Sequence, residues 1–289
     1  MTGAPQTTDG VEIAPDIAAT TFVDRMTDKS PVVIAVVNNK GGVGKTTTAV
    51  NLAAALASPR RRLLLIDLDS QASASLWLGV DRAHLRPSSA SCMLQEFPAQ
   101  HAIRSTRVQN LDLITGSVEL ANADLVLAQV AGRELALKLA LQRVRSRYDI
   151  IILDCPPNLS LVGINALVAA DALIVPVTPQ HLAIEGLVSL MTSVETVRLR
   201  LSSKNQLLGI LLTMVAPTSG RGPSLARSLR DEYGERVFRT EIASSPVLEQ
   251  APTAARTIFQ FAPRSRAAAS FERLAAEVLD RLRATRADR

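Results

Sequence analysis

The 289-residue sequence has few aromatic side chains and few cysteines. Phe, Trp and Tyr together make up 3% of the chain, whereas 47% of all residues are hydrophobic. Aliphatic side chains must therefore build the core, which is typical of helix-rich α/β proteins and argues against an all-β fold. The two cysteines, Cys92 and Cys155, are too few for a disulfide framework or for a self-contained metal site.

Long apolar runs are also missing from the sequence. It contains no stretch of about 18 consecutive apolar residues, so it predicts no transmembrane helix. The amino terminus lacks the basic segment and apolar core of a secretory signal peptide. We therefore expect a cytoplasmic protein, and its length is sufficient for a sizeable buried core.

Charge is distributed unevenly along the chain, whose formal net charge is +5. Residues 1–30 hold five acidic and two basic side chains and show no sustained hydrophobic periodicity. This pattern predicts a flexible acidic tail followed by a single domain over residues 31–289. Residues 198–289 hold sixteen basic side chains, nearly all arginine, against nine acidic ones. Such clustering suggests nucleic acid as a partner.

Short apolar runs alternate with helix-length segments throughout the predicted domain. The pattern is typical of parallel strands buried on both faces, and it predicts a doubly wound, mostly parallel α/β sheet flanked by helices. Ligands of such sheets bind at the carboxyl ends of the strands. The predicted strands cover residues 32–37, 63–66, 111–115, 149–153, 172–177 and 207–213.

Two further segments differ from this alternation. Residues 80–106 are less regular and predict a loop with one short helix. The last stretch, from residue 266 onward, places Phe271, Leu274, Val278 and Leu282 on one helical face with arginines opposite. A helix lying on a membrane surface has the same pattern, but we expect this helix to pack on the sheet.

A glycine-rich loop follows the first predicted strand and precedes a helical pattern. In this context backbone N–H groups converge on phosphate, and the helix dipole favours negative charge. Lys45 can reach the β and γ phosphate oxygens, and Thr46 can ligate Mg²⁺, so ATP and Mg²⁺ are the predicted cofactors. The predicted nucleotide contacts here are Gly41, Gly42, Val43, Gly44, Lys45, Thr46 and Thr47.

Three aspartates follow predicted strands. Asp67 and Asp69 are two residues apart, so in an extended chain both carboxylates point to the same side. Asp154 follows four consecutive apolar residues, which is the Walker B arrangement for holding Mg²⁺. One of these acids can serve the Mg²⁺ shell while another orients an attacking water, as phosphoryl transfer to water requires.

The segment KGGVGKTT resembles the deviant Walker A motif of the ParA/MinD family of P-loop ATPases, with Asn39 where the standard motif has glycine. The resemblance extends over most of residues 32–284 and is strongest for ParA-type partition ATPases. It implies that Lys45 is the ordinary P-loop lysine. It also implies that Lys40 is the signature lysine that reaches across a nucleotide sandwich dimer to the partner's phosphates.

The resemblance assigns roles to the acids as well. Asp69 is implied as the residue for ATP hydrolysis, Asp67 as a supporting magnesium or switch residue, and Asp154 as the Walker B acid. After Asp69 the family has Pro, Gly and Asn where this chain has Ser70, Ala72 and Ser73, which leaves the hydrolysis rate open. The implied neighbours of the adenine are Thr213, Met214 and Pro252.

The function implied by the resemblance is an ATP-dependent switch for DNA segregation. Its ATP-bound homodimer binds non-specific double-stranded DNA over the nucleoid, and hydrolysis stimulated by a ParB-type partner releases it. A related ATPase that positions a protein cargo shares every motif. A MinD-like membrane-cycling ATPase is a weaker alternative, because it would need an amphipathic tail after the last helix and we expect the last helix to pack on the domain; no membrane contact is predicted. The predicted DNA contacts are Arg198, Arg200, Lys204, Arg221, Arg227, Arg230, Arg236, Arg239, Arg264 and Arg266.

Overall fold

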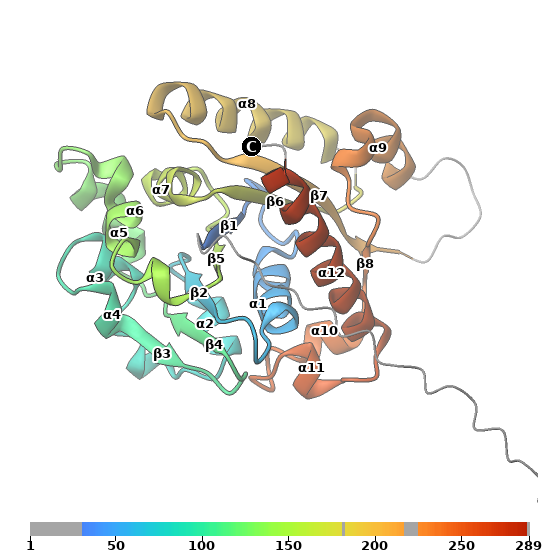
Figure 1. Cartoon of the computed structure of the whole chain (residues 1–289), viewed down its shortest axis with the longest axis horizontal. Helices are drawn as coiled ribbons and strands as arrows, with labels where there is room; N and C mark the ends of the chain where they lie inside the picture. The colour runs from blue at the N-terminus through green and yellow to red at the C-terminus, as the bar shows by residue number, and fades with distance from the viewer. Residues whose placement is uncertain (1–30, 181–182, 217–224, 288–289) are drawn as a thin grey trace, which may run out of the picture.

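A computed structural model describes residues 31–180, 183–216 and 225–287 of the chain (Figure 1). The predicted acidic tail, residues 1–30, lies outside the described residues, as does Arg221. Within the described residues, no helix is both long enough and apolar enough to cross a membrane.

An eight-stranded sheet forms the centre of the described structure, with the order β3-β4-β2-β5-β1-β6-β7-β8. Neighbouring strands pair in parallel except β3, which runs antiparallel to β4. The fold prediction is confirmed, and each of the six predicted apolar runs forms a strand. The strands are β1 (Val32–Val36), β2 (Leu63–Asp67), β3 (Ile103–Ser105), β4 (Leu111–Ile114), β5 (Ile150–Asp154), β6 (Ala172–Val177), β7 (Gln206–Val215) and β8 (Ile242–Ala243).

The sequence pattern did not predict strands β3 and β8. They contain three and two residues, which is too short for an alternation of side chains to be recognised. The irregular segment that contains β3 also forms α3 (Ser89–Met93) and α4 (Ala99–Ala102), two short helices where one was predicted. Both β3 and β8 lie at the edges of the sheet, where pairing with a single neighbour suffices.

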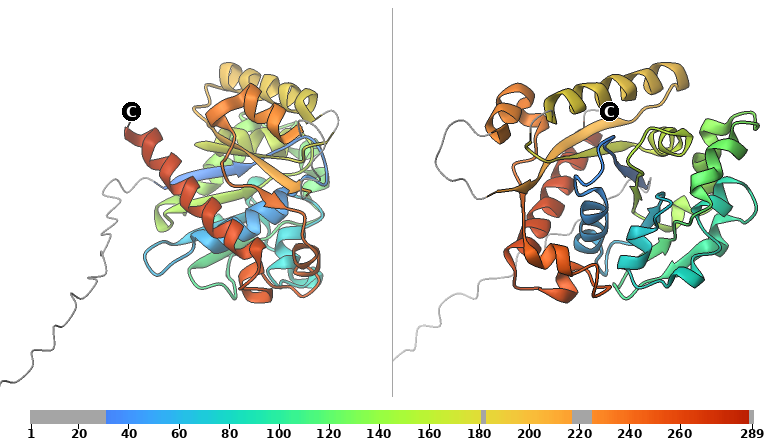
Figure 2. Two further views of the ribbon diagram at one scale, coloured as in Figure 1. Left: turned by 90° about the vertical axis from the view of Figure 1, so that its right-hand side faces the viewer. Right: turned by 180° about the vertical axis from the view of Figure 1, so that it is seen from behind.

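Helices cover both faces of the sheet, as Figures 1 and 2 show. One face carries a hydrophobic core with α1 (Lys45–Leu56), α2 (Ser73–Trp77), α10 (Pro246–Gln250), α11 (Ile258–Phe261) and α12 (Arg266–Ala287). The core on the other face is formed with α3, α4, α5 (Leu120–Leu127), α6 (Ala136–Leu141), α7 (Leu161–Ala169), α8 (Ala183–Leu201) and α9 (Leu225–Tyr233). Short 3₁₀ turns lie at Arg82–His84, Arg133–Leu135, Arg145–Arg147 and Gly234–Arg236.

Helix α12 packs across the face that carries α1. Its predicted apolar stripe is buried, with Phe271, Leu274 and Val278 fully covered and Leu282 only 6% exposed. The prediction that the last helix packs on the domain is therefore confirmed. The apolar side that a membrane-surface helix would need is already occupied by the core.

Strand pairing brings the functional segments to one edge of the sheet. Strands β2, β5 and β1 are adjacent and parallel, so their carboxyl ends lie side by side. Asp67, the last residue of β2, is directly opposite Asp154, the last residue of β5. The loop after β1 begins at the same edge, because Val36 is also opposite Asp154.

Candidate functional site

The loop between β1 and α1 is held in place by Asn38. Its side-chain amide donates to the carbonyl oxygen of Pro176 on β6 at 2.7 Å, and its Oδ1 accepts from the backbone N–H of Lys40 at 2.9 Å. Gly42 and Gly44 adopt left-handed φ values of 73° and 83°, which favour glycine over residues with a side chain. Helix α1 starts immediately after Gly44, so its N-terminus faces the concave side of the loop.

The two lysines of this loop lie in different environments. Lys45 is buried, and its Nζ donates to the carbonyl oxygen of Lys40 at 2.9 Å. Burial lowers the pKa of Lys45, although the charge of Asp154 partly offsets this effect. Lys40 is exposed, and its Nζ lies 3.4 Å from Oε1 of Gln180. One lysine therefore belongs to the interior of the site, while the other extends to the surface of the protein.

Asp154 is a fully buried carboxylate, and neither of its oxygens makes a full hydrogen bond among the described residues, although the Thr46 side chain lies close enough to interact with it. Burial, followed by the negative charge of Asp67, raises the pKa of Asp154 well above its usual range, whereas Thr46 and Lys45 act to lower it. A buried carboxylate without full hydrogen bonds is costly unless a cation compensates it. Its interactions with both Lys45 and Thr46 fit a magnesium ion held beside a nucleotide phosphate.

The described residues contain no group of three His, Cys, Asp or Glu side chains that could hold a metal ion together. Mg²⁺ is usually bound through one or two protein oxygens, with phosphate oxygens and water completing its shell. Thr46 and Asp154 are suited to supply those oxygens.

Asp67 differs from Asp154, because its carboxylate is occupied by protein donors. Its Oδ1 accepts from the backbone N–H of Asp69 at 3.1 Å. Its Oδ2 accepts from the N–H and from the hydroxyl of Ser75, at 2.9 and 2.7 Å. Burial raises the pKa of Asp67 to about 6, and the Ser75 bonds act in the opposite direction. Asp69 itself is half-buried, and its Oδ1 accepts from the N–H of Gln71 at 2.9 Å.

The segment after Asp69 contains a left-handed residue at the position where the resemblance implies glycine and this chain has alanine. Ala72, at that glycine position, has a φ of 54° and is buried. A residue with a Cβ pays about 1–2 kcal/mol for this conformation. The surrounding contacts therefore hold the turn, even though Ala72 would not favour it by itself.

Two adjoining hollows lie beside the loop. The first, of about 580 Å³, is lined by the loop glycines, Lys45, Thr46, Asp69 and Pro157. The second, of about 660 Å³, shares Gly44, Thr47 and Met214 with the first and continues over β8 and α10. Phosphates fit the first hollow, because the loop glycines, Lys45 and the N-terminus of α1 line it.

The second hollow contains the three predicted adenine neighbours, Thr213, Met214 and Pro252. Thr213 also donates from Oγ1 to the carbonyl oxygen of Val43 at 2.9 Å, which connects β7 to the phosphate loop. Sequence reasoning missed the rest of this wall, because β8 and α10 are too short to be recognised. The missed lining residues are Ile242, Ala243, Ser244, Ser245, Leu248 and Glu249.

The predicted DNA contacts do not form one patch. Arg198, Arg200 and Lys204 lie at the end of α8 and before β7, at the amino edge of the sheet (Figure 1). Arg227 lies on α9, which follows the carboxyl end of β7. The ten residues of β7 lie between the two groups in the chain, so they come from different ends of this strand.

The remaining arginines differ in their contacts. Arg230 binds the carbonyl oxygen of Phe238 at 3.0 Å and Glu241 at 2.7 Å, so it connects α9 to the chain before β8. Arg236 and Arg239 are exposed on the segment between α9 and β8. Arg264 and Arg266 are exposed at the start of α12.

The parallel sheet, the glycine loop and the buried acid at the end of a neighbouring strand define a P-loop ATPase. Comparison with known sequences supports this class, since a family profile described as "AAA domain" matches residues 32–208. The chain is 38% identical to the sporulation initiation inhibitor protein Soj of Bacillus subtilis over 246 residues, which cover 85% of this chain and 97% of Soj. It is 34% identical to the chromosome partitioning protein ParA of Caulobacter vibrioides over 253 residues, covering 87% of this chain and 95% of that protein. The chain belongs to the ParA-type partition ATPases.

Solved structures show the same fold. A Mycobacterium smegmatis protein named cobyrinic acid a,c-diamide synthase, with bound ADP and magnesium, has a TM-score of 0.72 and 30% identity, and the match covers 88% of this chain and 96% of that one. The MinD cell division ATPase of Pyrococcus furiosus has a TM-score of 0.71 at 23% identity, covering 86% and 98% of the two chains. At that identity the second likeness is evidence for the fold alone.

Proposed function

We propose that this protein is an ATP-dependent switch for DNA segregation, which binds DNA as an ATP-bound dimer and leaves it after hydrolysis. The observation that carries the proposal is the pair of lysines in one phosphate loop. Lys45 is directed into the site, whereas Lys40 is exposed at its rim. A phosphate site contained within one chain explains the buried lysine but leaves the exposed one without a role.

ATP and Mg²⁺ are the proposed cofactors, and a related structure contains ADP and magnesium. Thr46 and Asp154 would hold the ion, and bound Mg²⁺ supplies positive charge to the phosphate oxygens. Lys45 and the loop N–H groups bind the phosphates. Asp69, which lines the same hollow, orients the attacking water. The base occupies the hollow between Thr213, Met214 and Pro252.

Lys40 gives the proposed dimer its dependence on ATP. In a two-fold dimer formed over the nucleotide edge, the exposed ammonium of one subunit pairs with the phosphates bound by the other. Charge-assisted hydrogen bonds to phosphate are stronger than neutral ones, so the dimer is stable while ATP is present. Loss of the γ-phosphate removes part of that attraction and releases the subunits.

DNA binding is proposed for the carboxyl side of the sheet. Arg264 and Arg266, at the start of α12, lie on this side, whereas Arg198 and Arg200 lie at the opposite edge (Figures 1 and 2). A dimer formed over the edge of the sheet that carries the nucleotide site brings Arg264 and Arg266 of both subunits into one surface. The second pair of arginines then binds the same DNA intramolecularly, which raises the overall affinity without any new contact.

The proposed function is tested by binding of a random-sequence duplex at moderate salt without nucleotide, with ADP, and with ATP and Mg²⁺. We expect binding only with ATP and Mg²⁺, and the affinity should fall steeply with salt because phosphate contacts dominate. R264E/R266E should weaken binding while R198E/R200E, at the far edge, should leave it nearly unchanged. Absence of DNA binding in every nucleotide state would refute the DNA part of the proposal.

Cargo positioning and DNA segregation share this mechanism up to the partner. A ParB-type protein is the proposed stimulator of hydrolysis, and it is tested by adding the product of any adjacent ParB-like gene to an ATPase assay with DNA. We expect faster hydrolysis only when that protein, DNA and ATP are present together. If the adjacent operon encodes a protein assembly and its components stimulate hydrolysis instead, cargo positioning replaces DNA segregation.

A further inference from the structure

The turn between β4 and α5 approaches the two acids of β2 closely. A Cβ atom added to Gly116 would lie 2.6 Å from the carbonyl oxygen of Asp69 and 2.8 Å from Oδ1 of Asp67. Ordinary contacts of a Cβ begin at about 3.4 Å. The backbone of the turn therefore lies directly against the segment that carries Asp69.

A chain of three hydrogen bonds joins this turn to Asp69. The N–H of Gly116 donates to Oγ of Ser75 at 3.0 Å. Ser75 donates from Oγ to Oδ2 of Asp67 at 2.7 Å, and Oδ1 of Asp67 accepts from the N–H of Asp69 at 3.1 Å. Ser75 is fully buried and is the central member of this set, since its hydroxyl both accepts and donates.

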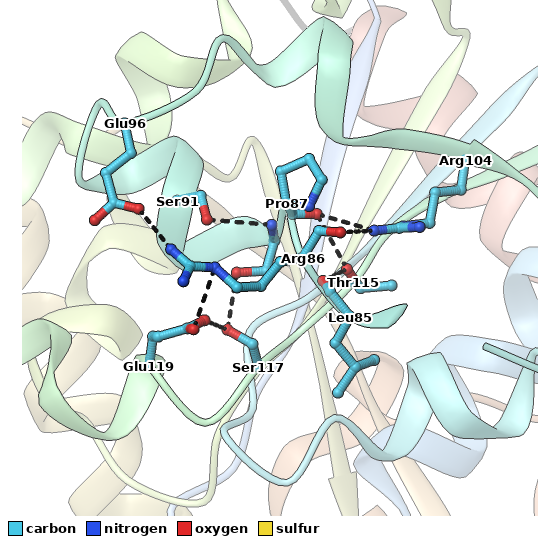
Figure 3. A network of polar contacts seen from close by, with 10 residues as sticks. Leu85, Arg86, Pro87, Ser91, Glu96, Arg104, Thr115, Ser117 and Glu119 are labelled. Carbon is cyan, nitrogen blue, oxygen red and sulfur yellow. Dashed lines mark hydrogen bonds and ion pairs between the residues drawn. The ribbon is translucent and has the colours of Figure 1, made fainter. Parts of the chain in front are cut away.

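The turn is anchored on its other side by the segment before α3 (Figure 3). The Thr115 hydroxyl donates to the carbonyl oxygen of Leu85 at 2.5 Å, and the hydroxyls of Ser88 and Ser117 are 2.8 Å apart. Arg86 pairs with Glu119 at 3.3 Å and with Glu96 at 3.2 Å. Ser88, Thr115 and Ser117 are buried, so their hydrogen bonds are shielded from water, whereas the ion pairs of Arg86 are exposed.

We propose that Ser75 is a positioning residue for ATP hydrolysis, which fixes the backbone at Asp69 by holding the Asp67 carboxylate against the β4–α5 turn. The inference rests on the proposed function, in which Asp69 orients the attacking water. It also changes the role predicted for Asp67. The carboxylate of Asp67 is engaged with Ser75 and Asp69, so its task is to hold this segment, and Asp154 remains the acid available to magnesium.

The test compares S75A, S75T and S75V. Thr keeps the hydroxyl, whereas Val matches the volume of Thr without it. Mutation of a residue that orients a metal ligand typically lowers activity by about 10-fold to 100-fold, and we use this range for Ser75. We therefore expect kcat to fall by about tenfold or more in S75A and S75V. S75T should remain close to the wild type, and the KM for ATP should change less than twofold because the phosphate loop is not altered. S189A, an exposed serine on α8, is the control for loss of a serine hydroxyl.

A second measurement does not depend on activity. Amide hydrogen exchange of the nucleotide-free protein reports the bonds of Gly116 and Asp69 directly. In S75A and S75V the amide of Gly116 loses its acceptor, and that of Asp69 loses the fixed orientation of Asp67. We expect both amides to exchange faster, while amides in α1 keep the wild-type rate. S75T should keep wild-type exchange at all of these positions.

Four outcomes would overturn the proposal. The first is an unchanged kcat in both S75A and S75V. The second is a rise in KM equal to the fall in kcat. The third is faster exchange throughout the domain, which would show a general loss of stability. If the wild type hydrolyses no ATP, the proposed function fails, and unchanged exchange at Gly116 and Asp69 in S75A would separately refute the role of Ser75.

Discussion

Replacement of Asp154 by asparagine should make the nucleotide-free protein more stable and at the same time abolish its function. The carboxylate is fully buried, and its oxygens make no full hydrogen bond among the described residues. An unsatisfied buried polar group costs about 1–3 kcal/mol, and more when it is charged. A neutral amide of nearly the same size removes the charge but remains a buried polar group, and the change also removes a charge that favours protonated Lys45, so we expect the free energy of unfolding to rise by only about 1 kcal/mol.

The pH dependence of this gain follows from the raised pKa of Asp154. The folded state binds the proton more tightly than the unfolded state, so the wild type loses stability as the pH rises above the unfolded value of about 3.9. This loss continues until the folded pKa is passed and amounts to at most about 1.4 kcal/mol per pH unit. D154N has no such group, and its advantage should therefore be larger at pH 8 than at pH 5.

The assay is thermal and urea unfolding of nucleotide-free wild type and D154N in EDTA at pH 5 and pH 8. For a domain of this size 1 kcal/mol corresponds to roughly 2–4 °C in Tm, so the gain is measurable. With ATP and Mg²⁺ the order should reverse, because D154N lacks the proposed magnesium ligand and the bound nucleotide and ion therefore stabilise the wild type more. D81N, which removes a carboxylate that is 86% exposed, is the control for a surface charge. A less stable D154N, or an equal gain at both pH values, would refute the reasoning.

The remaining predictions concern the dimer, hydrolysis and the core. K40A should bind ATP but fail to dimerise with it in size-exclusion chromatography, since the exposed ammonium of Lys40 makes a long hydrogen bond of 3.4 Å to Gln180 within its own chain. A K40A dimer would exclude the cross-subunit role. D69A should dimerise with ATP and hydrolyse none of it, and measurable phosphate release would contradict the role of Asp69. F271A, in the buried stripe of α12, should lower the free energy of unfolding by about 3–5 kcal/mol in urea titrations; a loss below 1 kcal/mol would show that α12 contributes little to the core.

The sequence alone determined the central strands, the phosphate loop and the three aspartates, because each is recognised from residues that are neighbours in the chain. Each central strand is a continuous apolar run because it is buried on both faces, and this signal needs no knowledge of its neighbours. The phosphate loop connects β1 to α1 without interruption, so its glycines and Lys45 could be assigned from adjacent residues. Asp67, Asp69 and Asp154 were placed at the functional edge because each ends or follows a strand, and parallel strands end at a common edge.

Contacts between distant segments were decided only by the tertiary structure. Ser75 and Gly116 are forty-one positions apart in the sequence, and their hydrogen bond exists because β4 pairs with β2. The wall of the base hollow comes from β8 and α10, which are too short to have a periodic pattern. In the sequence, Arg230 is one of many arginines in a basic segment and cannot be told apart from the others. Its bonds to Phe238 and Glu241 depend on how α9 packs. Charge and periodicity describe a residue and its neighbours in the chain, whereas strand order and helix packing determine which side chains meet.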